Sequence, residues 1–524
     1  MKEINVTTLD ESATRAESRS IQTLILIGLV AAGFIIGLVS STLPVLIIVG
    51  IITGIALFIL FYRRPEWGLY LFLILNMTVP QAGLNWNIGI QTPVGERGLH
   101  FNFHEIVGAI VFLTFLIKVI LDLLKMRTKY PMWKNVGEYL FGLVNNPLTI
   151  ALILYVLTSI LAGFVGMIHG GDFFILVYRL IRTVFFVYIF YLVINIIKTR
   201  KQLQVMVIII LITSTLVAGF GLAQKAAGQA WTEEFSSTWL DKMGYPEEVN
   251  YVAGEVGEVK TYRVNSTFLH PNVLGGLLVL ALPFIISFMF MTWGKRRYLL
   301  CVLLFISLLI NGSCLFFTGS RAAWIAAGFI TFAYGLFGIL EKRMVLVVVM
   351  AVLLILLLFF LIAPPDFVKK RMTSVHAQEA TQARIYQYSM AMDLFMEHPI
   401  LGLGVGMEGQ VIVQNNVRQE WAAVENAFLT YLVSHGIVGL IPFLLIFFIF
   451  WSMLFYARGK SRDDPFIYYC SESLILAVLA LAMCNMFGAW LLFAIPMLTL
   501  FWFIMGMGGS LYNLFREQQK EAAS

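Results

Sequence analysis

Two ionisable residues stand where polar segments pass into long apolar runs, and each has side-chain chemistry suited to catalysis. Arg321 lies in the segment Thr318-Gly-Ser-Arg-Ala-Ala-Trp324, and its guanidinium offers five donors in a planar fork that matches pyrophosphate oxygens. Its alternative role is an interfacial anchor beside Trp324. Glu425 precedes Asn426 at the start of another apolar run. Its carboxylate can act as a general base when burial raises its pKa, or it can favour the positive N-terminal end of a helix.

Three further arginines are candidates for substrate contacts, because charges in or near a bilayer are costly and need a reason. Arg179 and Arg182 are three residues apart and share one helix face, where they can pair with Asp172 or Glu105 or line a polar cavity. Arg384 lies near the start of an amphipathic segment that predicts a helix over 380–397, ending before His398-Pro399. Its alternative role there is a solvated charge. The predicted apolar stripe of that helix consists of Ile385, Tyr388, Ala391, Met392 and Phe395.

A third group of polar residues surrounds the start of a further apolar run, in Arg263-Val-Asn-Ser-Thr-Phe-Leu-His270-Pro-Asn272. Pro271 suits the first turn of a helix, because its missing N–H would be unsatisfied there anyway. Ser266 or Thr267 is expected to cap that helix. His270 either belongs to the helix start or contacts substrate.

The sequence lacks the motifs of metal-dependent and nucleotide-dependent enzymes and the nucleophile elbow of serine hydrolases. There is no DxD pair, no HExxH, no Walker lysine and no G-x-S-x-G, so no metal and no cofactor are expected. The glycines at 402, 404 and 406 follow no strand of a βαβ unit, which argues against a dinucleotide loop and favours backbone flexibility at a helix end. The four cysteines lie in or beside apolar runs and show no metal-binding spacing.

The elements that must position these residues are membrane helices. Hydrophobic residues make up 59% of the 524 residues and charged residues only 13%, whereas soluble domains carry about 25% charged residues. The run at 344–363 holds no ionisable side chain, and as a helix such a run matches the thickness of the bilayer. The sequence therefore predicts an all-α polytopic membrane protein with about 12–14 transmembrane helices.

The candidate spans share this apolar character and lie near 22–39, 44–62, 66–81, 103–124, 147–168, 173–197, 203–223, 268–292, 297–317, 321–340, 344–363, 424–456, 467–487 and 490–512. Every second connecting loop is basic, one of them through Arg458, Lys460 and Arg462. The positive-inside rule then predicts that both termini are cytoplasmic.

Long polar connections on one face of a rigid scaffold often carry function, and they guide the division of the chain. The predicted parts are a cytoplasmic tail at 1–21, an N-terminal transmembrane bundle at 22–223, an extracytoplasmic loop at 224–267, transmembrane helices of the catalytic region at 268–363, a large, partly helical extracytoplasmic loop at 364–423, C-terminal transmembrane helices at 424–513 and a cytoplasmic tail at 514–524.

Four motifs occur in a fixed order between 263 and 440. They are Arg263…Ser-Thr-x-x-His270-Pro-Asn272-x-x-Gly275, then Thr318-Gly-Ser-Arg321-x-x-Trp324, then Arg384 followed by His398-Pro399-x-x-Gly402-x-Gly404-x-Gly406, and Glu425-Asn426…Gly436-x-x-Gly439. In this order and spacing they resemble the O-antigen ligase and polymerase superfamily of membrane glycan transferases. The resemblance implies a glycosyltransferase C-like helical fold and an undecaprenyl-diphosphate-linked donor on the outer leaflet. It also implies transfer to a saccharide or lipid acceptor without metal or nucleotide.

In the ligases of that superfamily, two arginines and one histidine are held to be essential. The resemblance carries the arginines onto Arg321 and Arg384, whereas Glu425 occupies the histidine position. This departure favours a polymerase, or a ligase-like branch that acts on another polysaccharide. We therefore expect the two arginines to hold the donor's pyrophosphate and Glu425 to accept a proton from the acceptor hydroxyl. The predicted substrate-binding residues are Arg263, His270, Asn272, Arg179, Arg182, Asn426 and His398.

Two other classes of function stay open on the sequence, a polysaccharide or lipid-linked-glycan transporter (flippase) and a non-catalytic scaffold of a glycan-assembly complex. Transporters more often hold their key charges near the bilayer midplane, whereas the candidates here lie at its outer edge. The predicted partners are the lipid-linked donor, the acceptor, membrane lipids and other polysaccharide-assembly proteins, with no nucleic acid. The predicted location is the plasma (inner) membrane, as a multi-pass protein.

Overall fold

The structure is a computed structural model, and it describes most of the chain. The described residues are 45–79, 83–86, 91–92, 95–96, 99–129, 142, 144–171, 173–232, 234, 263–268, 270–342, 375–405, 407, 411–414, 417–420, 424–488 and 494–524. The predicted spans at 22–39 and 344–363 lie outside them. The chain divides into two compact units, Met1–Arg64 and Pro65–Ser524. In the first unit, α2 spans Val45–Arg63.

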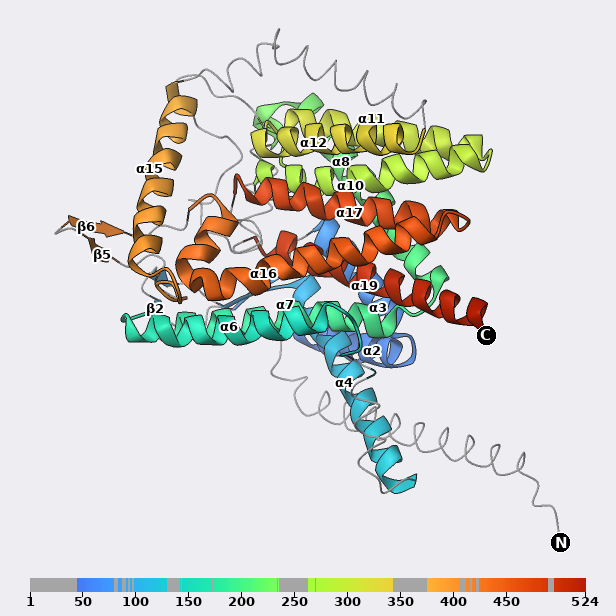
Figure 1. The fold of residues 1–524 in the computed structure, drawn as a ribbon, viewed down its shortest axis with the longest axis horizontal. Coiled ribbons are helices and arrows are strands. Elements are labelled where there is room, and N and C mark those ends of the chain that lie inside the picture. Colours follow the sequence, from blue (N-terminus) through green and yellow to red (C-terminus); the bar gives the residue numbers. More distant parts are fainter. Residues whose placement is uncertain are drawn as a thin grey trace. The chain divides into compact units, whose positions relative to one another are not determined.

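Helices make up nearly all of the second unit (Figure 1). They are α3 (Pro65–Thr78), α4 (Phe103–Lys129), α6 (Thr149–Ile168), α7 (Phe173–Ile196), α8 (Arg200–Ala227), α10 (Pro271–Gly294), α11 (Tyr298–Phe317), α12 (Arg321–Leu340), α15 (Val375–Glu397), α16 (Ala427–Lys460), α17 (Pro465–Asn485) and α19 (Ile495–Ala523). Each predicted span that falls on described residues coincides with a helix. Among the described residues, 10 helices are long and apolar enough to cross a membrane. The prediction of an all-α polytopic membrane protein is confirmed.

Three short antiparallel hairpins lie in the connections between helices. They pair β1 (Gly83–Trp86) with β4 (Leu99–Asn102), β2 (Gln91–Thr92) with β3 (Gly95–Glu96), and β5 (Val411–Gln414) with β6 (Val417–Glu420). Each sheet has two strands, and an isolated two-stranded hairpin is only marginally stable. The hairpins therefore belong to the loops of a helical fold and do not form its core.

The core of the second unit is built around three helices. The apolar windows of α10 and α19 are each 83% buried and that of α17 is 78% buried, whereas those of α11 and α12 are 28% buried and that of α4 is 22% buried. α10 packs against both α17 and α11, and α19 packs against α7. Because lipid tails are as apolar as leucine, the outer helices can leave large hydrophobic side chains on their surface.

The start of α10 corrects one expectation from the sequence. The helix is capped by His270, whose Nδ1 accepts a hydrogen bond from the Asn272 backbone N–H at 3.0 Å. Ser266 and Thr267 do not cap it, because the Ser266 hydroxyl instead donates to the carbonyl oxygen of Val217 at 2.7 Å. The residue that lies immediately before Pro271 is thus the one placed to satisfy the first free N–H groups.

α15 confirms the amphipathic helix predicted for 380–397, although it begins five residues earlier, at Val375. The predicted apolar stripe is only partly right. Ala391 is buried, but Ile385 is 64% exposed and Met392 is 46% exposed. Only the face that meets the following glycine-rich segment and α16 is covered, so apolar character alone did not identify the packed side.

α16 contains two features that the sequence did not predict. Its helical geometry is broken at Gly436, where φ is 63° and ψ is −168°. The helix also continues to Lys460, so Arg458 is a buried residue of its last turn. The expectation that Arg458 lies in a basic loop was wrong, because a buried carboxylate partner on α17 allows the helix to carry a charge inside the protein.

Candidate active site

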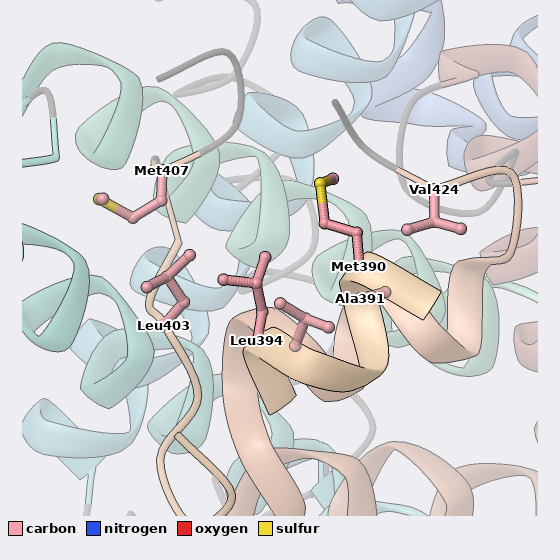
Figure 2. Packing of buried hydrophobic residues seen from close by; sticks show 7 residues of the cluster. Met390, Ala391, Leu394, Leu403, Met407 and Val424 are labelled. Atoms are coloured by element: carbon pink, nitrogen blue, oxygen red, sulfur yellow. The ribbon is translucent and has the colours of Figure 1, made fainter. Parts of the chain in front are cut away.

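A hydrophobic cluster holds α15 against the start of α16 and the glycine-rich segment. Its buried members, six of which are labelled in Figure 2, are Met390, Ala391, Leu394, Leu403, Met407, Val424 and Val433. Tyr388, Phe395 and Leu429 pack against this cluster from its edge. Since Val424 directly precedes Glu425, the cluster fixes the polar residues of α15 and of the α16 start relative to each other.

Arg384 and Glu425 form an ion pair across this contact. The Arg384 Nε donates to Glu425 Oε2 at 2.6 Å, and Nη2 donates to the same oxygen. The Arg384 side chain is 29% exposed and the Glu425 side chain is 53% exposed. An ion pair this open to solvent contributes only about 0–1 kcal/mol, so an anionic ligand can displace the carboxylate from the guanidinium at little cost.

Arg321 belongs to the same cluster of charges. It is the first residue of α12, directly after the N-cap Ser320. The charges of Arg384 and Glu425 both act on it. Three residues from α12, α15 and the start of α16 therefore lie within electrostatic range of one another. Two cations against one carboxylate leave the cluster with a net positive charge that suits an anionic substrate.

The segment 263–272 supports the turn that presents Arg321. Arg263 is only 5% exposed; its Nε donates to the Thr318 carbonyl at 2.8 Å and its Nη2 donates to Asn272 Oδ1 at 2.6 Å. Together with the His270 cap, these bonds tie the start of α10 to the connection between α11 and α12. Three residues predicted to bind substrate thus make hydrogen bonds that position the backbone just before Arg321.

The glycine-rich segment threads between α6 and the break in α16. Leu403 N–H donates to the Val433 carbonyl at 2.8 Å, and Val405 N–H donates to the Ala162 carbonyl at 3.0 Å. Gly404 has φ of 102°, and a Cβ on it would lie 2.1 Å from the backbone nitrogen of Gly166. For Gly402 and Gly404 the expectation of a flexible helix end is corrected, because both allow close backbone packing and the Gly404 N–H donates to the Ser434 carbonyl next to the break. The glycine at 406 lies outside the described residues.

His398 and Asn426 also take part in local structure. The ring centroid of His398 lies 4.9 Å from that of His169, and the His169 Nδ1 lies 2.7 Å from the Leu403 carbonyl oxygen. The Asn426 side chain caps α16 by accepting from Leu429 N–H at 3.0 Å. His398 therefore lies on the α6 side of the glycine-rich segment, and Asn426 aligns the helix that begins beside Glu425.

Arg179 and Arg182 line a cavity of about 70 Å³ between α6, α7, α16 and α19. The Arg182 Nη1 donates to the Tyr178 hydroxyl at 3.1 Å, whereas its Nη2 is buried without a hydrogen-bond partner. Of the two acids expected to pair with them, Glu105 accepts bonds from Asn102, and the other, at 172, lies outside the described residues. Both arginines line this polar cavity, and the buried Arg182 Nη2 without a hydrogen-bond partner favours an oxygen-bearing ligand there.

A match to a known family adds to this geometry. Residues 306–444, from α11 into α16, match the family model of the O-antigen ligase domain. This segment of the chain is similar to the O-antigen ligase domain. The match includes Arg321, Arg384 and Glu425, and it supports glycan transfer of the ligase or polymerase type, with lipid-linked glycans and saccharides as substrates in general. No curated protein matches the chain.

Two residues that lie beside the candidate site residues were not predicted from the sequence. Tyr388 lies one helical turn after Arg384, and its hydroxyl donates to the Glu425 carbonyl at 3.3 Å. Burial raises the pKa of Tyr388, although the charge of Arg384 acts in the opposite direction. The spacing of four residues from Arg384 was the available signal, because such residues are neighbours on a helix surface.

His435 is the second overlooked residue. It lines the cavity with Arg179 and Arg182, its ring stacks on Tyr431 with centroids 3.8 Å apart, and its Nδ1 lies 3.0 Å from the Ser434 hydroxyl. Along α16 it is about 15 Å from Glu425 at the ordinary helical rise. Its only sequence signal was its place directly before Gly436.

Among the residues that the structure describes, no group of three or more His, Cys, Asp or Glu side chains is arranged to hold a metal ion. Positive charge at the candidate active site comes from Arg321 and Arg384. The arrangement can bind a diphosphate and place one carboxylate beside it.

Proposed function

We propose that this integral membrane protein transfers or polymerises glycan from an undecaprenyl-diphosphate-linked donor onto a saccharide or lipid acceptor. The observation that carries the proposal is the cluster of Arg321, Arg384 and Glu425 at the starts of α12 and α16. In the orientation predicted from the basic loops, the starts of α12 and α16 lie at the outer face of the plasma membrane, and both termini lie in the cytoplasm. We place the catalytic region in α10, α11 and α12, in α15, and at the start of α16.

The two arginines supply the electrostatic part of the reaction. They bind the donor's diphosphate and stabilise the charge that grows on it as the bond from the anomeric carbon to the phosphate oxygen breaks. Groups already positioned in this way often provide the largest catalytic term. Undecaprenyl diphosphate leaves with the bonding electron pair, and the two guanidinium groups balance the charge that it gains.

Glu425 acts as the general base for the acceptor. It takes the proton of the acceptor hydroxyl as that oxygen forms the new glycosidic bond, and attack opposite the leaving group inverts the anomeric configuration. Proton transfer of this kind contributes about 10²–10⁴-fold. Glu425 stands at the position of the family histidine, which suits a polymerase or a ligase-like branch acting on another polysaccharide.

The ion pair between Arg384 and Glu425 gives the two substrates an order. Without donor, the carboxylate is bound by the guanidinium. A diphosphate competes for Arg384 with more charge than one carboxylate carries, and it thereby frees Glu425 to accept a proton. Donor binding therefore precedes activation of the acceptor.

The other candidate residues serve this reaction from two places. Arg263, His270 and Asn272 position the backbone before Arg321, and Asn426 and His398 hold the starts and ends of the helices around Glu425. Arg179 and Arg182 bind an oxygen-rich part of a substrate in the cavity beside His435. These assignments extend the site from α12 and α15 to α6 and α7.

The deciding experiment gives full-length protein in lipid nanodiscs an undecaprenyl-diphosphate-linked glycan and a panel of saccharide and lipid acceptors. Mass spectrometry of the products detects a new glycosidic bond, which neither a transporter nor a scaffold forms. We expect Arg321→Ala and Arg384→Ala to lower the rate about 10²–10³-fold. The exposed Arg297→Ala serves as the matched control and is expected to keep the wild-type rate.

Substitutions of Glu425 test the role of the base. Glu425→Gln is expected to lose about 10²–10⁴-fold in rate, and Glu425→His to keep more activity than Glu425→Gln, because an imidazole can also accept the proton. Full activity of Glu425→Gln would make the carboxylate structural. Normal product from both arginine variants at wild-type protein levels would rule out the whole scheme.

A further inference from the structure

A second polar pocket lies far from the cluster of Arg321, Arg384 and Glu425 in the sequence and uses none of its residues. It has a volume of about 220 Å³ and is formed where α7 ends and the last turns of α19 pass beside it. The α7 side contributes Asn195, Ile197 and Lys198, and the α19 side contributes Ser510, Asn513, Leu514, Arg516, Glu517 and Lys520.

The charge of this pocket is strongly one-sided. Lys198, Arg516 and Lys520 line it, against the single carboxylate of Glu517. Among the described residues, no ion pair joins any of these four side chains. Three cations that gather around one hollow repel each other, and an anion in the hollow relieves this repulsion.

Arg200, at the same end of the bundle, differs from the cations of the pocket because it is paired with a carboxylate. Its guanidinium makes a bidentate ion pair with Asp464, at 2.8 and 2.9 Å, and lies 5.0 Å from the ring centroid of Phe466. Arg200 is thus engaged by the protein itself. Lys198, only two residues away, faces the pocket instead.

The remaining lining fits a phosphate that is attached to a lipid. The side-chain amides of Asn145 and Asn513 add hydrogen-bond donors, while Ile194 and Leu514 add apolar walls. Ser510 and Glu517 are each three or four residues away from both Asn513 and Leu514, so the four residues share a face of α19. The charged residues Arg516, Glu517 and Lys520 follow the apolar part of α19, as expected where a membrane helix leaves the hydrocarbon core.

We infer that this pocket binds the phosphate headgroup of an anionic membrane phospholipid. The basic end of the bundle is its cytoplasmic end in the orientation predicted from the loops, and lysine and arginine clusters next to membrane helices attract anionic lipids of that leaflet. The site is independent of glycan transfer. Its effect is to anchor the C-terminal helix against α7 at the membrane surface.

Native mass spectrometry of the full-length protein in detergent tests the inference. The protein is titrated with phosphatidylglycerol and, separately, with zwitterionic phosphatidylcholine of the same acyl chains. We expect phosphatidylglycerol to bind more tightly. Arg516→Gln and Lys520→Gln are each expected to weaken it by about fivefold, and the double variant by about 25-fold, without changing phosphatidylcholine binding.

Two controls make the result decisive. Lys201→Gln removes an exposed cation that does not line the pocket and is expected to bind phosphatidylglycerol as the wild type does. Inorganic phosphate at the same concentration is expected not to displace the lipid. The inference is overturned if phosphatidylglycerol binds no better than phosphatidylcholine, if the double variant keeps wild-type affinity, or if inorganic phosphate alone competes fully. The single variants keep the test valid if the double variant does not fold.

Discussion

Two arginine–glutamate clusters stand at opposite ends of α16, and they differ in almost every physical respect. At the start, Arg384 and Glu425 form one exposed pair. At the end, Arg458 binds Glu341 at 2.8 Å and Glu472 at 2.6 Å, with side-chain exposures of 10%, 16% and 1%. The comparison shows that the same residue types serve binding where solvent can reach them and serve structure where the protein encloses them.

In the buried cluster, each charged side chain already has close partners within the protein. The Arg458 guanidinium lies 4.4 Å from the ring centroid of Phe337 and 4.6 Å from that of Tyr468. Tyr468 donates to Glu341, and the Ser287 hydroxyl lies 3.3 Å from Glu472 Oε1. α10, α12, α16 and α17 meet in this network. Because every charged group already has close partners, a ligand has little to gain there.

The largest effect is expected from breaking the buried cluster. Arg458→Ala leaves Glu472 buried without its cation, which costs about 3–5 kcal/mol. Thermal unfolding of the purified protein, followed by size-exclusion chromatography, measures the loss. Arg462→Ala, an exposed arginine four residues away, is the matched control. Wild-type stability of Arg458→Ala would contradict the structural role assigned to this cluster.

A smaller loss of stability is expected on substitution of Arg263, which is buried like Arg458 but supports the turn before Arg321. Arg263→Gln removes the charge from the bonds to the Thr318 carbonyl and to Asn272, and because the glutamine amide still donates to one of these acceptors, the expected cost is that of one charge-assisted bond, about 1.5–3 kcal/mol. Glycan transfer should fall, because the turn before Arg321 loses its support. The measurement pairs the rate of transfer with the melting temperature. A reduced rate in Arg263→Gln with an unchanged KM for the lipid-linked donor would be expected of a positioning residue, and a wild-type rate would refute that role.

The smallest effect on stability is expected at the exposed pair. Arg384→Gln should change the free energy of unfolding by no more than about 1 kcal/mol, even though it abolishes most transfer. Chemical unfolding curves of the wild type and the variant provide the comparison. A loss as large as that of Arg458→Ala would mean that the two clusters do not differ in kind.

Much of the fold followed from local patterns in the chain. Apolar runs of bilayer length predicted each described span, and the period of the segment after 380 predicted the helix that carries Arg384. These predictions succeed because hydropathy and helical period are properties of neighbouring residues. The same patterns misjudged the packed face of α15 and the place of Arg458, since both depend on what another element presents to them.

The sequence by itself determined the membrane helices, the order of the motifs and the residue types that can bind a diphosphate and accept a proton. Only the tertiary structure decided which charges meet. Arg384 and Glu425 are 41 residues apart, Arg200 and Asp464 are 264 residues apart, and no local pattern encodes such pairings. A charged side chain either pairs within the protein or remains accessible to a ligand. Which of the two occurs depends on its burial and on the partners that distant segments bring to it, and tertiary packing determines both.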